Sequence, residues 1–329
     1  MKARGLIESC LVSMVSLWVF PACAFLGFGP TTFQEAYKKG AKAKIWFRVV
    51  DDIGNPVDGA NVNVFFDMAD RSKGRRVIKQ TDANGVCIAE EKTKGVLEIE
   101  VSREGYYRSN DLISFITMGH EHEVENGKWQ PWGMDRQIIL LPVKNPQARI
   151  AGTSDWKRTR ELKKWLGFDL MKYDFVKPYG DGIVSDVEVM FDWDGVWDIK
   201  DYRGMALKMR FSEKYAGGYY ATKTPGSEYV GIYHANTNEY YKTEFSYSER
   251  VTGRDKRGNV TGYERQSFDT SKVLVVRSRC KLNEDGSLKS ANYFLIYYIQ
   301  FAGGKRGAAL KFLSIYNPTP NDTNLEPKQ

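Results

Sequence analysis

Cysteine is scarce in this sequence, and its placement excludes two kinds of site. The 329 residues include four cysteines, two of which, Cys10 and Cys23, lie in the N-terminal segment. No CxxC pair or cysteine cluster occurs, so the usual zinc–thiolate and dithiol redox motifs are absent. The other two, Cys87 and Cys280, fall in different predicted domains. They could form one disulfide in an oxidising compartment or remain two separate buried thiols, and both alternatives stay open.

Histidine is scarcer still, and no familiar catalytic motif occurs. The chain has three histidines and contains no GxSxG nucleophile elbow, no HExxH pair and no Walker loop. Carboxylates occur throughout the sequence, so their spacing nominates no glycosidase pair. The sequence therefore names no catalytic residue and favours a non-catalytic protein. A glycan-active enzyme with its site in the second domain is the alternative.

Long apolar runs are absent beyond the first residues. Lys2 and Arg4 precede an apolar run over residues 11–20, and a small-x-small site follows it. This is the pattern of a secretory signal, and the run is shorter than the ~20 residues of a membrane span. We therefore expect a signal peptide over residues 1–24, export to the periplasm or extracellular space, and no transmembrane span. Lipid anchoring through Cys23 is an alternative that the preceding residues fit less well.

The excess of positive charge is small and dispersed. The chain has 48 Lys and Arg against 41 Asp and Glu, a net charge of +7, with short basic clusters at 71–76 and 157–160. A nucleic-acid-binding protein usually concentrates its positive charge in one stripe or module, so no nucleic acid partner is expected. A basic exported protein could instead contact an anionic polymer of the cell envelope. The expected partner is a cell-envelope glycan or protein, and the sequence carries no signal of oligomeric state.

Period-two alternation of apolar residues begins at residue 43. It recurs in KIWFRVV (44–50), NVNVFFD (61–67) and VLEIEVS (96–102), and segments rich in glycine, asparagine or proline separate these runs. Such alternation is typical of half-buried strands, and connectors of this kind form turns. Short strands at this spacing predict an antiparallel sandwich rather than a helical fold.

The turn residues of this region also carry a resemblance. Their order is Asp51-x-x-Gly54-x-Pro56-Val57-x-Gly59-Ala60, then Thr81-Asp82-x-Asn84-Gly85, Thr93-x-Gly95 and Gly105-Tyr106. This pattern resembles the carboxypeptidase regulatory-like domain, a group close to transthyretin-like and Cna B-type modules. It covers roughly residues 43–143, about a third of the chain. The resemblance implies a β-sandwich that serves as an accessory, spacer or adhesion module of exported proteins, and it implies no activity.

The first turn of this pattern contains three aspartates, Asp51, Asp52 and Asp58. They flank glycine and proline residues whose backbone preferences account for a turn between two strands. We therefore expect exposed carboxylates there rather than a calcium site.

Changes in composition suggest the domain limits. A lead-in over residues 25–42 precedes the first sandwich at 43–143, and a basic linker follows at 144–166. The linker could form one amphipathic helix with Ser154 as its N-cap, or it could be an extended bridge.

A second, larger β domain is predicted over residues 167–316. Strand-like segments such as IVSDVEVMF, KVLVVRSRCKL and ANYFLIYYIQF recur, with hairpin turns at 255–259 and 283–286. They predict an antiparallel sandwich or open barrel that resembles only segments of uncharacterised exported bacterial proteins. The chain is thus expected to be all-β, with two antiparallel β domains, the first Ig-like or transthyretin-like. The polar tail, residues 317–329, is expected to be disordered.

Two segments contain residues typical of metal ligands. His120 and His122 alternate, so both imidazoles could face one zinc ion and make this a metal-binding periplasmic protein. The segment DWDGVWDIKD supplies oxygen ligands that calcium prefers, although not in EF-hand order. Its aspartates are Asp192, Asp194, Asp198 and Asp201. Solvated histidines and a charged turn are the simpler interpretations, so no cofactor is expected, with zinc or calcium as alternatives.

Aromatic residues are plentiful, with 8 Trp, 19 Tyr and 17 Phe. Trp129 and Trp132 lie in one predicted loop, and Trp193 and Trp197 lie in another. Exposed flat rings beside polar residues would suit stacking on sugars, whereas the same side chains also fill sandwich cores. The four tryptophans are therefore candidate ligand-binding residues, and the loop that contains Trp129 and Trp132 is preferred because its neighbours are polar.

Overall fold

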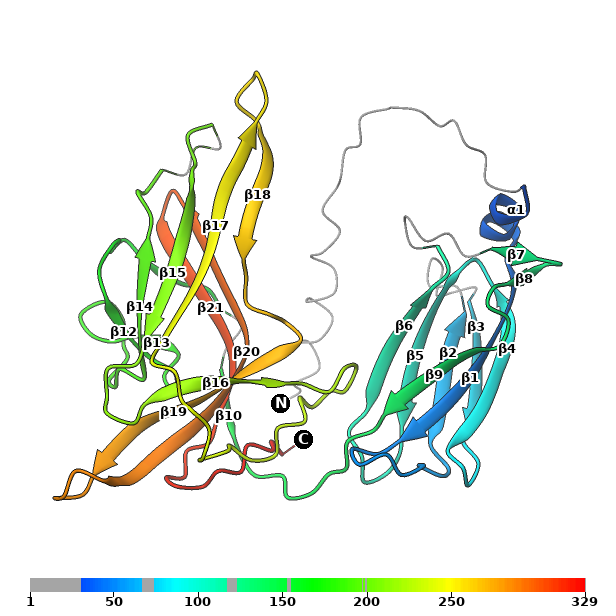
Figure 1. The fold of residues 1–329 in the computed structure, drawn as a ribbon, viewed down its shortest axis with the longest axis horizontal. Coiled ribbons are helices and arrows are strands. Elements are labelled where there is room, and N and C mark those ends of the chain that lie inside the picture. The colour runs from blue at the N-terminus through cyan, green and yellow to red at the C-terminus, as the bar shows by residue number, and fades with distance from the viewer. Residues whose placement is uncertain are drawn as a thin grey trace.

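The computed structural model describes residues 31–66, 74–116, 123–152, 155–196, 198 and 200–328. In this part of the chain one helix, α1 (Thr31–Lys39), accompanies strands that form four sheets in two domains (Figure 1). The prediction of an all-β fold with two β domains is confirmed. The expected signal peptide lies outside the described residues. No helix among those described has the length and apolar character to cross a bilayer.

The first domain is a sandwich of two sheets. Sheet I has the order β4-β1-β8-β7, with β9 also paired to β1, and sheet II has the order β3-β2-β5-β6. The strands of sheet I are β1 (Ala41–Val50), β4 (Val86–Thr93), β7 (Val124–Glu125), β8 (Lys128–Trp129) and β9 (Met134–Ile139). Those of sheet II are β2 (Asn61–Phe66), β3 (Arg75–Gln80), β5 (Val96–Ser102) and β6 (Ser109–Ser114). Sheet I is mixed rather than purely antiparallel, because β1 pairs in parallel with both β8 and β9.

The turn after β1 forms as the sequence suggests. Asp51 stabilises the turn, because its Oδ1 accepts hydrogen bonds from the backbone N–H groups of Ile53 and Asn55 at 3.0 and 2.8 Å. Gly85 has a φ of +71°, and a Cβ there would lie 2.4 Å from the carbonyl oxygen of Val49. Only glycine fits such a close approach at positive φ.

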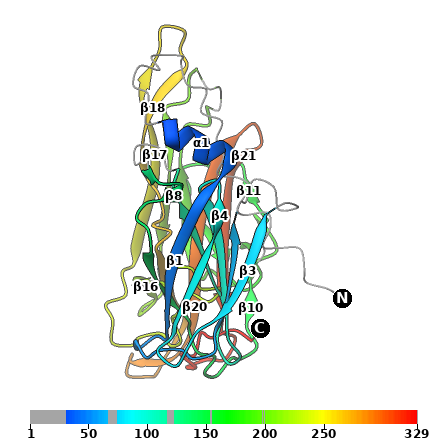
Figure 2. The same cartoon turned by 90° about the vertical axis from the view of Figure 1, so that its right-hand side faces the viewer.

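The second domain is also a sandwich of two sheets. Sheet III has the order β10-β21-β20-β19-β16, with β11 also paired to β21, and sheet IV has the order β13-β12-β14-β15-β17-β18. The strands of sheet III are β10 (Ile150–Ala151), β11 (Lys157–Thr159), β16 (Gly217–Thr222), β19 (Lys272–Leu282), β20 (Leu288–Gly304) and β21 (Gly307–Tyr316). Those of sheet IV are β12 (Leu166–Asp169), β13 (Asp174–Phe175), β14 (Val187–Asp192), β15 (Gly204–Arg210), β17 (Glu244–Arg254) and β18 (Val260–Gln266). The β17–β18 hairpin rises beyond the rest of the domain in both overall views (Figures 1 and 2).

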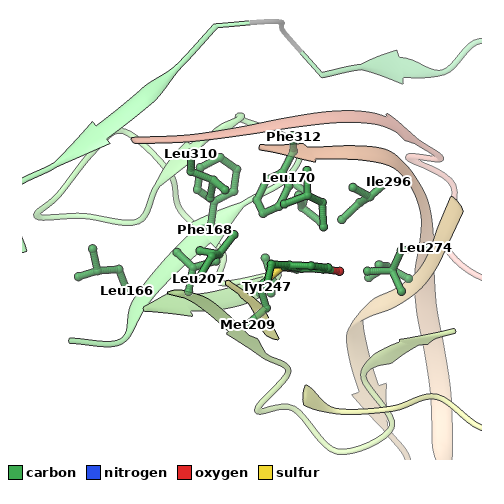
Figure 3. Close-up of a cluster of buried hydrophobic side chains, with 14 of the residues drawn as sticks. Leu166, Phe168, Leu170, Leu207, Met209, Tyr247, Leu274, Ile296, Leu310 and Phe312 are labelled. Carbon is green, nitrogen blue, oxygen red and sulfur yellow. The ribbon is translucent and has the colours of Figure 1, made fainter. Parts of the chain in front are cut away.

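The core of the second domain lies between sheets III and IV (Figure 3). Phe168 of sheet IV meets Phe312 of sheet III edge to face, with ring centroids 5.2 Å apart. Residues 273–276 of β19 and 291–296 of β20 are buried on both faces, because the loop 223–243 and the C-terminal tail cover the outer face of sheet III. Burial on both faces explains why these two strands read as continuous apolar runs rather than as alternating ones.

A buried ion-pair network joins the two sheets of this core. Asp169 at the end of β12 and Asp186 just before β14, both in sheet IV, accept hydrogen bonds from the guanidinium of Arg279 on β19, with N–O distances of 2.8–2.9 Å. Arg279 has a φ of +54° and lies where the register of β19 shifts between Ser278 and Lys281. This bulge turns the side chain to the core side, whereas strict alternation would place it on the same face as Arg277.

Of the two alternatives for the linker, the helix is not present in the described residues. Residues 144–152 and 155–166 contain no helix, and β10 and β11 instead pair with β21. The proposed N-cap, Ser154, lies outside the described residues. The alternative of an extended bridge is the one that the structure has, because backbone pairing to the edge of β21 satisfies the linker's polar groups.

The prediction of a disordered tail is wrong for residues 317–328. Leu325 is fully buried and Glu326 is 1% exposed, despite the polar sequence around them. The Asn317 amide donates to the carbonyl oxygens of Asp322 and Asn324, both at 2.7 Å. Such side-chain bonds let a polar segment pack in place of the apolar contacts that it lacks.

Glu326 ties the tail to both the first domain and the linker. Its Oε1 accepts hydrogen bonds from the Tyr107 hydroxyl and the Lys144 N–H at 3.0 and 2.9 Å, and its Oε2 accepts from the Asn145 N–H at 2.6 Å. Nearby, the Asn110 N–H donates to the carbonyl of Gly226, so a loop of the second domain extends the edge of sheet II. The two domains are therefore docked by hydrogen bonds as well as by packing.

Replacing Glu326 is expected to weaken this docking. In Glu326→Ala the buried Tyr107 hydroxyl and the part-buried N–H groups of Lys144 and Asn145 lose their acceptor, which should lower the free energy of unfolding by about 3 kcal/mol and speed protease cleavage in the linker. Urea unfolding and limited proteolysis measure both effects. Glu284→Ala, at an exposed hairpin turn, is the matched control. Equal stability and cleavage rates in the two variants would contradict the docking role.

The buried Asp169 predicts a dependence of stability on pH. Burial acts to raise its pKa, but hydrogen bonds from the backbone N–H groups of Lys172, Ile183 and Val184, with the charge of Arg279, hold the pKa below 3.8. A carboxyl whose pKa is lower in the folded state stabilises the fold above its ordinary pKa, and this stabilisation is lost as the pH falls.

The wild type should therefore lose stability as the pH falls below about 4, while Asp169→Asn should show a shallower loss over that range. Thermal unfolding at pH values between 2 and 7, in steps of about one pH unit, measures the slope of stability against pH for both proteins. Asp181→Asn, at an exposed position, should keep the slope of the wild type. A slope in Asp169→Asn equal to that of the wild type would show that this carboxyl does not carry the effect.

Candidate binding groove beside strand β20

β20 is longer than its pairing with β19. The pairing runs from Leu288 to Ile296, where Ile296 lies opposite Leu274. Beyond a register shift at Tyr297, residues 298–304 pair with β21, and no second strand borders them in the described part of the chain. One edge of β20 is therefore without a strand neighbour over its last seven residues, Tyr298 to Gly304.

A cavity of about 630 Å³ lies along this edge. One wall is β20, and the opposite wall is formed by β15, β17 and β18 of sheet IV, with the connector 267–271 at one end. The cavity, which we call the β20 groove, is lined by Tyr202, Met205, Ser248, Glu249, Tyr263, Arg265, Ser267, Phe268, Thr270, Tyr298, Ile299, Gln300, Phe301, Ala302 and Gly303.

The lining of the groove shows that it follows the edge of β20 rather than one of its faces. Side chains of successive strand residues point to opposite faces of a sheet. All six consecutive residues from 298 to 303 nevertheless border the same cavity. A cavity over one face would meet every second residue, so this one must run along the backbone edge of the strand.

The polar chemistry of the groove centres on Glu249. Its Oε2 accepts a hydrogen bond from Nε of Arg265 at 2.6 Å, and its Oε1 accepts one from the Tyr202 hydroxyl at 3.1 Å. Burial and the neighbouring Glu249 charge raise the pKa of Tyr202, so its hydroxyl keeps its proton at neutral pH. Glu249 is the one carboxylate among the described lining residues, and its charge is balanced within the groove.

Aromatic side chains supply the apolar part of the lining. Tyr263 is exposed and carries the guanidinium of Arg265 4.7 Å from its ring centroid, whereas Phe268 is buried at the base. Trp193 supports the far end, because a Cβ on Gly303 would lie 2.9 Å from its ring. The groove thus combines rings, hydroxyls and a backbone edge on rigid strands.

Two of the four tryptophans predicted to bind a ligand lie in a core. Trp129 is fully buried, stacks on Phe115 with centroids 5.5 Å apart, and donates its Nε1–H to the carbonyl of Thr93 at 3.0 Å. Trp193 is 3% exposed and belongs to the core of the second domain. Neither ring presents a face to solvent, so as exposed stacking platforms these two predictions are wrong. Sandwich cores attract such side chains because they bury a large apolar area.

Of the other two predicted tryptophans, Trp132 lies at the surface of the first domain. Trp132 is half-buried, and the Lys128 ammonium lies 4.7 Å from its ring centroid. The Lys44 ammonium lies between Trp132 and the exposed Trp46, 6.0 and 5.7 Å from their ring centroids. Trp197 lies outside the described residues. Trp132 therefore stays a candidate surface contact, separate from the β20 groove.

The predicted metal ligands are not brought together in the described residues. His120 and His122 lie outside them. Asp194 and Asp198 accept hydrogen bonds from the backbone of their own turns, and Asp192 pairs with Lys208 at 2.7 Å. Within the described ranges no three His, Cys, Asp or Glu residues are placed to share an ion.

The two cysteines in the described part of the chain are both free thiols. Cys87 is buried in the first domain and Cys280 is half-buried in the second. Of the two alternatives, separate thiols are the one that the structure has, and a Cys87–Cys280 disulfide is not formed. Burial raises the pKa of each thiol to about 11.

The sequence did not nominate the residues of the β20 groove. Most of their strands were predicted, but a groove along an edge depends on where the neighbouring strand stops, which alternation does not show. One signal was present: ANYFLIYYIQFAGG is longer than the apolar part of KVLVVRSRCKL, so part of the later strand had to lack that neighbour.

Comparison with known proteins adds no function. No protein-family model matches the chain, and no curated protein matches it. Among solved structures, 3-chlorocatechol 1,2-dioxygenase from Rhodococcus opacus 1CP is similar at 12% identity over 32% of this chain and 60% of that one, with a TM-score of 0.25. Wild-type catechol 1,2-dioxygenase from Acinetobacter radioresistens is similar at 13% identity over 34% of this chain and 55% of that one, with a TM-score of 0.24. The chain spans less than two thirds of these enzymes, and similarity at this level carries no argument about activity.

The thiol environments predict slow alkylation. At pH 8 a thiol of pKa about 11 is about 100-fold less ionised than one of pKa 9.0, and the thiolate is the reactive form. Iodoacetamide labelling followed by peptide mapping should show slow modification of Cys87 and Cys280 in the folded protein and rapid modification in urea. Rapid labelling of either thiol in the folded protein, or recovery of a disulfide-linked peptide pair, would contradict this arrangement.

Proposed function

We propose that the protein is an exported, non-catalytic binding protein whose ligand lies in the β20 groove. The observation that carries the proposal is a cavity of about 630 Å³ bordered by a strand edge with no second strand partner in the described chain. Its size falls in the range of roughly 300–1,000 Å³ typical of ligand sites. Its aromatic rings and hydroxyls supply apolar contact and orientation for a ligand.

The groove is better suited to binding than to bond cleavage. Glycoside hydrolysis uses two carboxyl groups on opposite sides of the scissile bond. Glu249 is the one carboxylate among the described lining residues, and both of its oxygens accept hydrogen bonds, from Arg265 and Tyr202. This arrangement supports a binding site in the second domain over a glycan-active enzyme there.

The rest of the chain supports a role in the cell envelope. The pattern of residues 1–24 is that of an export signal. The turn motif of the first domain resembles carboxypeptidase regulatory-like modules, which would make this domain a spacer or attachment unit. Envelope glycans and protein segments are the ligand classes that an exported groove of this size and chemistry could hold.

Filling the groove should abolish binding without disturbing the fold. Thr270 is exposed at the end of the groove, so an indole there would occupy the space of the ligand. The full chain, expressed with its export signal, would be tested on a glycan array and with a phage-displayed random nonapeptide library. Binding by one of these probe sets should fall by about 10-fold or more in Thr270→Trp.

Thr237→Trp is the matched control, because Thr237 is exposed in a turn outside the groove. It should bind as the wild type does, and thermal unfolding should show that both variants fold. The proposal is refuted if neither probe set binds, or if Thr270→Trp binds as tightly as Thr237→Trp.

A further inference from the structure

We infer that the ligand of the β20 groove is an extended polypeptide segment that adds to sheet III as a strand beside residues 298–303. The inference rests on the proposed function of the groove and names its ligand class. Its basis is the edge geometry of β20, independent of the aromatic side chains.

The edge of β20 presents a regular row of backbone donors and acceptors. In an antiparallel pair, alternate residues direct both their N–H and C=O groups toward one neighbour, and the intervening residues direct theirs away. Over residues 298–303 β21 takes one set, and no strand in the described chain takes the other. Such groups must be satisfied by water or by a partner, and an extended peptide matches their spacing.

The groove admits one strand rather than a whole sheet. Glu249 of β17 and Tyr263 and Arg265 of β18 line the wall that faces β20, and the connector 267–271 lines one end. A second copy of a folded sheet would have to pass this wall to reach the edge, whereas a single segment needs only the width of one strand. The bordered edge is six residues long, about 20 Å at roughly 3.3 Å per residue.

The side chains around the edge indicate the composition of the segment. Side chains of an added strand alternate in direction, so every second one would face Phe268 and Phe301 in the groove. These positions favour aromatic or β-branched residues. Arg306 is exposed in the turn at the end of β20, while the charge of Glu249 is already balanced by Arg265. An acidic residue is therefore favoured at the end of the segment that lies nearest this turn.

Backbone N-methylation tests strand addition directly. A peptide recovered from the random nonapeptide phage library would be resynthesised with a fluorescein label in two N-methylated forms, one at odd-numbered and one at even-numbered amides. Strand addition uses every second amide of the ligand. One form should therefore lose about 10-fold or more in affinity for the full chain, and the other should stay within about 3-fold of the parent peptide. Fluorescence anisotropy measures both.

The variants used for the groove complete the test. Thr270→Trp should abolish binding of the parent peptide, and Thr237→Trp should leave it unchanged. Equal effects of the two methylation patterns, or no recovered peptide, would overturn strand addition. If a glycan binds, Thr270→Trp abolishes that binding and no peptide is recovered, strand addition is overturned while the proposed function stays intact. Absence of any ligand from either probe set would overturn both.

Discussion

The last seven residues of β20 have only one strand neighbour in the described chain, and the candidate site depends on this mismatch. β20 has 17 residues and β19 has 11, so the two cannot pair along the whole length of β20. Exposed strand edges usually invite unwanted pairing, and natural proteins shield them. Here the β17–β18 hairpin lies opposite the free edge of β20, and the connector 267–271 lines one end of the space between them. The shielding leaves a groove rather than a flat edge, which selects for a narrow ligand.

Two polar side chains fix the arrangement of the sheets and of the domains. Arg279 links Asp169 and Asp186 across the sandwich, so sheets III and IV keep their spacing. Glu326 joins the tail to Tyr107 of the first domain and to the linker. Burying such groups is costly unless every hydrogen bond is made, and that requirement specifies one arrangement of sheets and domains.

Strand positions could be predicted from the sequence. The effects of a bulge, of contacts between distant residues and of unequal strand lengths could not. Alternation located most strands, and the glycines and proline after β1 located its turn, because these signals are local. The bulge at Arg279 reverses the direction of a side chain that alternation assigns to the other face. Burial of Trp129 and ordering of the tail depend on contacts with residues far along the chain, which composition does not reveal. The groove was missed for the same reason, since it depends on where a neighbouring strand ends.

Hydrogen exchange at single amides of residues 298–303 tests the central claim most directly. In the free protein, the amides that face β21 should be protected, and every second amide should exchange about 100-fold faster or more. The segment from Phe294 to Ile296, which pairs with both β19 and β21, should be protected throughout. Uniform protection from residue 298 to 303 would show that the edge of β20 is already paired, and it would contradict the existence of the groove as a binding site.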